Sequence, residues 1–235
     1  MTTINNPTLV LANLFAAYLS AKSMSPPNPP PANHEKSDSL FRVPRFAPSP
    51  NSGAMQFLFL ALSQTYLVAR GVTPSSPASL TFFPNLGNVN EKFLTWNRYS
   101  ATCLGLIGIS GIIRLAAYKS LGRNFTFELA KPNQLKTDGI YRYVQHPSYL
   151  PLIIIMSTNA AYLWAPDGVL GAWLGRAVVE ALVPWKRVAW VGWSVLWFFI
   201  LVVRVRDEEE MLREAFGREW EEWHAKTARF LPWVF

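Results

Sequence analysis

The segment at residues 135–150, LKTDGIYRYVQHPSYL, gathers side chains that could bind a charged ligand. Asp138-Gly139 is typical of a turn, and Pro147 suits the first turn of a following helix with His146 as its cap. The free N–H groups of a helix start bind anions. Aromatic faces with polar tips surround this start: Tyr141, Tyr143, His146 and Tyr149. The segment predicts a ligand site, unless His-Pro only begins a helix and the tyrosines form an interfacial belt.

A second group of candidate residues lies in the charged segment 204–233, RVRDEEEMLREAFGREWEEWHAKTARFLPW. On a helix, Arg204 and Glu208 share one face. An apolar stripe runs beside them, with Gly217 loosening the helix: Val205, Leu212, Phe216, Trp220 and Trp223. Other acids of the segment are typical of a solvated helix: Asp207, Glu210, Glu221 and Glu222. Because an unpaired charge at a membrane edge is costly, Arg204 and Glu208 are the functional candidates.

The composition indicates a membrane protein. Half of the 235 residues are apolar, and 22 basic and 15 acidic residues are fewer charges than a soluble domain carries. Uncharged runs cover 46–69, 143–166 and 188–203, and basic groups flank them. The net charge of +7 therefore fits membrane flanks better than a nucleic-acid partner. One cysteine and three scattered histidines predict neither a disulfide framework nor a metal site.

These patterns predict an all-α fold, a polytopic membrane helix bundle with a cytosolic loop and a C-terminal amphipathic helix. Residues 1–21 should form a short apolar helix, interfacial or marginal because it is too short to span. Residues 22–52, with eight of the 18 prolines, read as a linker. Residues 53–97 should hold the first span and its loop, and 98–235 the core. We therefore expect the first 50 residues to be dispensable for catalysis.

Within the core, the uncharged stretches predict spans at about 98–119, 147–165 and 188–203. Residues 168–183 are either an interfacial helix or a further span, which leaves four to six spans in all. Three glycines in the first of these stretches, Gly105, Gly108 and Gly111, predict close helix packing rather than a dinucleotide loop. If 168–183 does not cross, the loop 120–146 and the tail meet on one side, and their basic residues predict the cytosolic side.

Together the two motifs resemble the isoprenylcysteine carboxyl methyltransferase family. That family has G-x-Y-x-x-x-R-H-P-S-Y, then two apolar spans, then R-x-x-x-E-E-x-x-L-x-x-x-F-G. This chain supplies Gly139, Tyr141, His146, Pro147, Ser148, Tyr149, Arg204, Glu208, Glu209, Leu212, Phe216 and Gly217 at the same spacing. Residues 121–129, LGRNFTFEL, resemble the L-G-x-x-F start of the family's loop. The resemblance covers roughly 98–233.

The resemblance implies a methyltransferase that moves a methyl group from S-adenosylmethionine to the C-terminal carboxylate of a prenylated cysteine. It places the enzyme in the endoplasmic reticulum membrane, with the active face and C-terminus cytosolic. The implied partners are a prenylated protein or prenylcysteine and the lipid bilayer, without nucleic acid. Implied cofactor contacts are Tyr141, His146, Pro147, Ser148 and Tyr149, with Asn133, Gln134, Leu135 and Lys136 on the adenosine side. Glu208 would bind the cofactor's ammonium, and Arg204 the substrate carboxylate, as the catalytic pair.

Simple chemistry agrees with these roles. A carboxylate acceptor is already ionised at neutral pH, so the reaction needs no general base. The site must instead align the acceptor oxygen with the methyl group. An arginine suits the acceptor because its planar fork binds a carboxylate with two hydrogen bonds.

The chain departs from the family pattern at several positions. Gln145 stands where the family usually has arginine, Lys136 replaces an apolar residue, residues 133–135 match only in part, and Trp220 and Trp223 replace tyrosines. If the missing arginine only weakens the site, Gln145→Arg should raise cofactor affinity. A harmful effect would mean that the pocket is built around glutamine.

Other functions remain open from the sequence. An NADPH-dependent sterol reductase has a similar histidine loop and R-x-x-x-E tail, and a phospholipid methyltransferase has a related architecture. A catalytically inactive membrane scaffold is the alternative that is not an enzyme.

Overall fold

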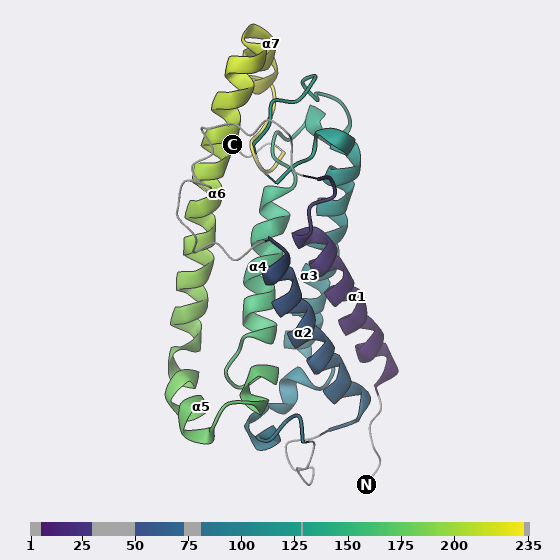
Figure 1. Ribbon diagram of the computed structural model, residues 1–235, viewed down its shortest axis with the longest axis vertical. Helices are drawn as coiled ribbons and strands as arrows, with labels where there is room; N and C mark the ends of the chain where they lie inside the picture. The colour runs from purple at the N-terminus through teal and green to yellow at the C-terminus, as the bar shows by residue number, and fades with distance from the viewer. Residues whose placement is uncertain (1–5, 30–49, 73–80, 128, 233–235) are drawn as a thin grey trace.

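The computed structural model describes residues 6–29, 50–72, 81–127 and 129–232, with the backbone alone at 50–52. Over these residues the fold is helical, and an isolated β-bridge joins Val144 to Ala228. The long helices run side by side along the molecule (Figure 1): α1 (Pro7–Met24), α2 (Pro50–Ala69), α3 (Arg98–Leu121), α4 (Tyr149–Leu163) and α6 (Lys186–Phe216).

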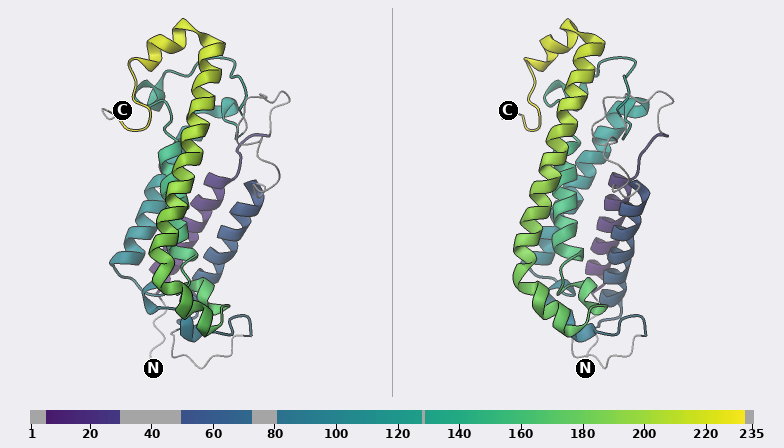
Figure 2. Two further views of the ribbon diagram at one scale, coloured as in Figure 1. Left: turned by 90° about the vertical axis from the view of Figure 1, so that its left-hand side faces the viewer. Right: turned by 60° about the vertical axis from the view of Figure 1, so that its left-hand side comes forward.

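Short helices cap the two ends of this bundle. At one end lie η1 (Leu86–Asn88), η2 (Glu91–Phe93), η5 (Val169–Ala172), α5 (Arg176–Leu182) and η6 (Val183–Trp185). At the other end lie η3 (Gly122–Asn124), η4 (Gly139–Arg142) and α7 (Arg218–His224). Figure 2 shows that the loop after α3 and the tail helix α7 meet at the same end of the bundle. The expected meeting of the two motif-bearing segments is therefore observed.

Two helical stretches, Glu91–Asn124 and Arg176–Phe216, are long and apolar enough to cross a membrane by length and composition. Gly53–Ala69 and Tyr149–Leu163 are apolar but shorter. The outer face of α6 exposes large apolar side chains, among them Val191, Leu196 and Phe199, which lipid tails would cover. Residues 168–183 form only η5 and α5, which are too short to cross by themselves.

The packing of α1 differs from that of the expected interfacial helix. Its side chains Leu9, Ala16, Ala17 and Met24 are buried in the main apolar core, together with residues of α2, α3 and α4. A Cβ on Gly111 of α3 would lie 2.8 Å from the Cβ of Leu19, so a glycine is needed where α1 and α3 touch. The expected linker 22–52 lies mostly outside the described residues.

Local sequence explains where the helices that frame the site begin and end. Asn97 starts α3 with a capping box, in which its side chain accepts from the N–H of Ser100 and the Ser100 hydroxyl faces the Asn97 N–H. Gly217 ends α6 with φ +50°, a left-handed conformation that favours glycine and lets the chain turn into α7. In the described part of the chain no atom lies within 4 Å of a Cβ placed on Gly105 or Gly108, so of the three glycines there Gly111 alone shows the predicted close packing.

Candidate active site

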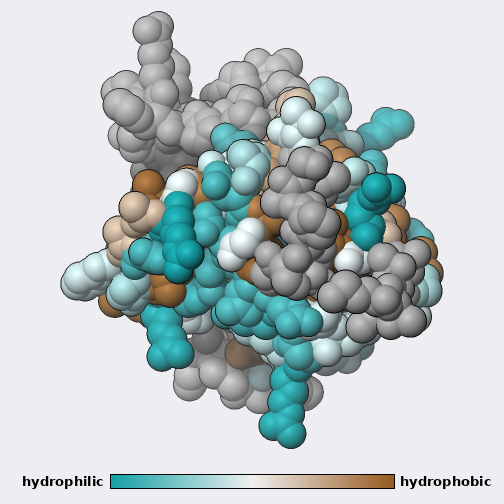
Figure 3. All heavy atoms as spheres, turned by 90° about the horizontal axis from the view of Figure 1, so that it is seen from below, coloured by the Kyte–Doolittle hydropathy of each residue, from teal (hydrophilic) through white to brown (hydrophobic). Residues whose placement is uncertain are grey.

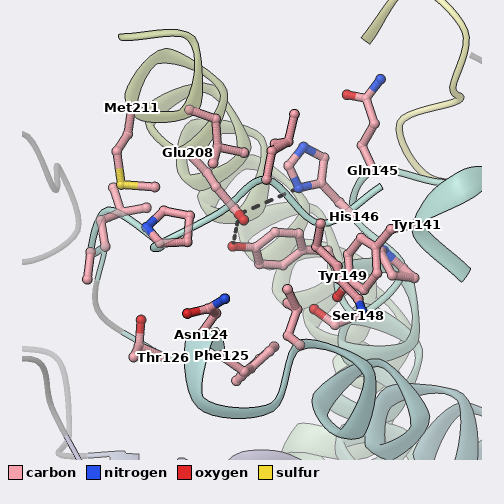
Figure 4. A pocket seen from close by; sticks show the side chains of 18 of the residues that line it. Asn124, Phe125, Thr126, Tyr141, Gln145, His146, Ser148, Tyr149, Glu208 and Met211 are labelled. Atoms are coloured by element: carbon pink, nitrogen blue, oxygen red, sulfur yellow. Dashed lines mark hydrogen bonds and ion pairs between the residues drawn. The ribbon is translucent and has the colours of Figure 1, made fainter. Parts of the chain in front are cut away.

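A cavity opens where the loop after α3, the start of α4 and the charged half of α6 meet (Figure 4). Most of the predicted site residues line it: Gln134, Leu135, Lys136, Tyr141, His146, Pro147, Ser148, Tyr149, Arg204 and Glu208. Asn133 is not among the lining residues and is exposed. Tyr143, expected beside His146, is 56% exposed and also lies outside the lining. The structure thus brings together residues that are up to about 75 positions apart in the chain.

Glu208 of α6 reaches into this cavity and meets two residues of the other motif. The Tyr149 hydroxyl donates to its Oε2 at 2.7 Å, and His146 Nδ1 lies 3.5 Å from the same oxygen. Both interactions use Oε2, and among the described residues no hydrogen bond or ion pair reaches Oε1. The spacing of the two sequence motifs therefore translates into one carboxylate held against the start of α4.

His146 lies between two carboxylates. Its Nδ1 faces Glu208, and its Nε2 is 3.5 Å from Glu209 Oε1 without a hydrogen bond. Burial lowers the pKa of His146, but the charges of Glu208 and Glu209 outweigh burial and raise this pKa to about 9. At neutral pH the histidine is therefore a buried cation paired with two acids.

The start of α4 differs from the prediction. The helix begins at Tyr149 after Ser148, and no side chain caps it, so His146 is not the cap and Pro147 precedes the first turn. Pro147 cannot donate a backbone hydrogen bond, and the Tyr149 N–H instead donates to the His146 carbonyl at 3.3 Å. His146 serves the site through its ring, which the Glu208 and Glu209 charges hold.

Arg204 lies one helical turn before Glu208, as the spacing predicts, and is 5% exposed. Its Nη2 donates to the Phe127 carbonyl at 2.6 Å, which ties α6 to the loop after α3. In Figure 4 the loop residues Asn124, Phe125 and Thr126 lie across the cavity from Glu208. Arg204 is thus a buried cation in the cavity wall, on the same helix face as the Glu208 carboxylate.

Gln145 has a role that the sequence did not indicate. It is 4% exposed, and its amide points away from the cavity toward the tail (Figure 4). Gln145 Nε2 donates to the carbonyl and the hydroxyl of Thr227, both at 2.9 Å, and its Oε1 lies 2.9 Å from His224 Nδ1. The backbone N–H groups of Gln145 and His146 donate to the carbonyls of Ala228 and Arg229. The Gln145 side chain therefore holds the C-terminal tail against the site through these hydrogen bonds.

Three further contacts hold the tail in place. Arg229 binds both oxygens of Glu209, at 2.8 and 3.0 Å. Trp223 Nε1 donates to the Tyr141 carbonyl at 2.9 Å. Leu129, Met211, Leu212 and Trp220 form a small buried cluster that Leu135, Phe216 and Trp223 extend. The tail therefore closes one side of the cavity, and the predicted apolar stripe supplies most of this packing.

Arg114 of α3 is a second residue whose role the sequence left unassigned. It is 4% exposed, and it donates to the carbonyls of Ser23 at 2.9 Å and Ser148 at 2.7 Å. Its guanidinium also lies 4.9 Å from the ring centre of Tyr118. No acidic side chain pairs with it among the described residues. Arg114 thus joins α1 and α3 to the start of α4, directly behind the cavity.

The donor set of the cavity suits a ligand that is both charged and partly apolar. Glu208 offers a carboxylate for a cationic group, and Arg204 offers a buried cation on the same face. Burial raises the pKa of Tyr141, so its hydroxyl stays a neutral hydrogen-bonding group. Phe125, Leu129, Leu135 and Met211 supply apolar wall. Among the described residues, no cluster of three or more metal-binding side chains is present.

Comparisons with known proteins agree with this geometry. Residues 103–167 match the isoprenylcysteine carboxyl methyltransferase (ICMT) family. A protein-S-isoprenylcysteine O-methyltransferase of Dictyostelium discoideum is 26% identical over 157 residues, covering 65% of this chain and 54% of the relative. A probable one of Oryza sativa subsp. indica is 30% identical, covering 56% and 60%. Protein-S-isoprenylcysteine O-methyltransferase B of Arabidopsis thaliana is 27% identical, covering 67% and 68%.

The chain spans between half and about two thirds of the length of these relatives. No solved structure matches it. The family match lies on α3, the loop and α4, the elements that carry Arg114, Tyr141, His146 and Tyr149. The chain is thus similar to the isoprenylcysteine carboxyl methyltransferase family over residues 103–167, and to protein-S-isoprenylcysteine O-methyltransferases over a longer part of its length.

Proposed function

We propose that this chain is a polytopic membrane methyltransferase that methylates the C-terminal carboxylate of a prenylated cysteine, with S-adenosylmethionine as the donor. The observation that carries the proposal is the placement of Arg204 and Glu208, one turn apart on α6, in the wall of one cavity with Tyr149 and His146. A carboxylate for the donor's ammonium and a cation for the acceptor's carboxylate thus lie side by side. The relatives are named as enzymes of the same reaction class, which supports the proposal.

The residues present fit this donor. Glu208 keeps Oε1 without a contact from the described residues, so a ligand ammonium could bind there while Tyr149 and His146 hold Oε2. The apolar wall of Phe125, Leu129 and Leu135 suits the nucleoside body, and Gln134 lies nearby in the lining. When bound, S-adenosylmethionine supplies an electrophilic methyl group on a sulfonium. Asn133, which the resemblance also assigned to the adenosine side, has no place in this lining.

The chain's own residues then orient and shield the reactants. Arg204 binds the acceptor carboxylate, which is already ionised and needs no general base. The charges of the buried Arg204 and the half-buried Glu208 are partly shielded from water, which makes them act more strongly than free ions. His146 stays charged and keeps Glu208 ionised and in position. The tail held by Gln145 and Arg229 excludes water from the same side.

We further propose that the active face and the C-terminus are cytosolic and that the membrane is that of the endoplasmic reticulum. The prenyl chain then reaches the site from the lipid side, where α6 exposes its apolar face. The polar loop admits the donor from the water side.

The deciding experiment offers one purified preparation several acceptors. Labelled S-adenosylmethionine is incubated with farnesylcysteine carrying a free carboxylate, with its methyl ester, with a sterol and with a phospholipid. We expect label transfer to the free carboxylate alone, because only this acceptor carries the anion that Arg204 binds. Transfer to the phospholipid instead, or binding of NADPH and not of S-adenosylhomocysteine, would overturn the proposal.

A further inference from the structure

The end of the bundle opposite the candidate active site contains an apolar cavity of about 670 Å³. It lies between the end of α4, the start of α6 and the segment that joins η2 to α3. Its walls are largely aromatic and aliphatic, with Phe93, Tyr99, Trp164, Leu182, Trp190 and Trp193 among them. This volume is within the range of small-molecule sites, and the proposed methyl transfer uses none of these residues.

The rim of this cavity is positively charged. Lys92, Lys186 and Arg187 line it, and no acidic side chain is among its described lining residues. Asp167, just outside the lining, pairs through one oxygen with Lys186 at 2.6 Å and with Lys92 at 3.5 Å. Two lysines therefore share one carboxylate. Figure 3 views this end from below and shows hydrophilic side chains gathered between apolar patches.

A buried donor in the wall lacks an acceptor. Trp193 Nε1 is shielded from water and has no hydrogen-bond partner among the described residues. Its neighbour Trp190 does have one, because its Nε1 donates to the Ser157 carbonyl at 2.8 Å. The two tryptophans therefore differ: a hydrogen bond fixes Trp190 to α4, whereas the Trp193 ring packs against Trp164 and Trp197.

We propose that this cavity binds one anionic phospholipid, with an acyl chain between the aromatic walls and the phosphate beside Lys92, Lys186 and Arg187. Two stretches of the chain are apolar enough to cross a membrane, and one of them begins beside this cavity. Tryptophans and lysines at the ends of such helices lie at the membrane–water interface, where lipids present a phosphate next to an acyl chain. A free anion would leave the apolar walls empty, and a lipid without net charge would leave the excess positive charge of Lys92, Lys186 and Arg187 over Asp167 unbalanced.

The test uses the full chain purified in a neutral detergent. Native mass spectrometry follows the binding of phosphatidylglycerol, of phosphatidylcholine with the same acyl chains, and of inorganic phosphate. We expect one phosphatidylglycerol per chain, bound about tenfold more tightly than phosphatidylcholine, because one charge-assisted contact has about that effect. Inorganic phosphate alone should show no retained binding. Equal affinity for the two lipids, or retention of free phosphate, would overturn the proposal.

Matched variants distinguish this site from a general interfacial belt. Arg187→Gln leaves the Asp167 pairs intact and should weaken phosphatidylglycerol binding about two- to fivefold, as for a partly exposed pair. Arg176→Gln is the control, an exposed cation at the same end that pairs with Glu180 and lies outside the lining. If Arg176→Gln matches Arg187→Gln, the attraction is diffuse and the proposed site does not exist.

A filled cavity gives an independent check. Ala189 lines the cavity from an exposed position on α6, so Ala189→Trp should occupy the space without disturbing the core. Methyl transfer takes place at the other end and serves as the measure of correct folding. An active Ala189→Trp variant that still binds phosphatidylglycerol as the parent does would refute the assignment of the lipid to this cavity.

Discussion

Replacing Gln145 by arginine should destabilise the protein instead of improving its site. Arginine has no acceptor atom, so His224 Nδ1 would lose its partner at 2.9 Å, and the Thr227 carbonyl and hydroxyl would face a bulkier cation. The lost bond to the half-buried His224, together with the crowding at Thr227, corresponds to about 1–3 kcal/mol. For a chain of this size, that loss lowers the melting temperature by roughly 2–12 °C.

Tryptophan fluorescence during thermal unfolding in detergent measures this shift, and titration with S-adenosylhomocysteine measures the site. Arg142→Gln is the control, because Arg142 is exposed in the same loop and should change neither quantity. We expect weaker ligand binding by Gln145→Arg, since Gln145 and His146 hold the tail through adjacent backbone bonds. An arginine variant that melts at the parental temperature and binds the ligand more tightly would show that the glutamine is a defect and that our account of the tail is wrong.

Three further predictions follow from the site and its frame. Arg204→Ala should raise the KM for the acceptor and Glu208→Ala should weaken cofactor binding, each about ten- to hundredfold for a lost charge-assisted bond. The control variants Arg206→Ala and Glu210→Ala replace exposed residues and should change activity less than about twofold. Equal steady-state kinetics for all four variants would refute the assignment. Because the pKa of His146 is raised from 6.5 to about 9 in the fold, its charge stabilises the protein fully below pH 6.5, and this contribution is lost as the pH rises through 9. The melting temperature should therefore fall over this window in the parent but less in His146→Gln, and parallel profiles would contradict the ion pairs. Deleting residues 1–29 should abolish cooperative unfolding, because α1 fills the core and its Ser23 carbonyl accepts hydrogen bonds from Arg114 and Tyr118. A truncated chain that melts and binds ligand like the parent would instead support the expectation from the sequence that the N-terminal residues are dispensable.

The features that could be predicted from the sequence are those that depend on local helical periodicity. A spacing of four residues on a helix is enough to place Arg204 and Glu208 on one face, and the order of apolar stretches is enough to bring the loop and the tail to one end. The motif residues His146 and Tyr149 then meet Glu208 as expected.

Contacts between segments far apart in the chain could not be predicted from the sequence. The partners of Gln145 are 79 and 82 positions away, and nothing in the local pattern indicates that a loop glutamine will meet a tail histidine and threonine. The N-terminal apolar stretch was judged by its length, yet its role depends on neighbours such as Gly111 that accept Leu19 closely. The cap assigned to His146 was wrong because two neighbouring carboxylates hold its ring.

The buried position of Arg114 has a consequence for how the chain enters the membrane. An arginine within an apolar helix opposes insertion by about 3 kcal/mol when it lacks partners. In the folded protein its hydrogen-bond partners lie on both sides of α3 in the sequence. The Ser23 carbonyl is synthesised before α3, and the Ser148 carbonyl is synthesised after it. We therefore expect α3 to insert poorly when it is synthesised alone, and to settle only after the α4 segment has left the ribosome. Biogenesis of this bundle would then proceed by a three-helix unit, α1 with α3 and α4, instead of one helix at a time.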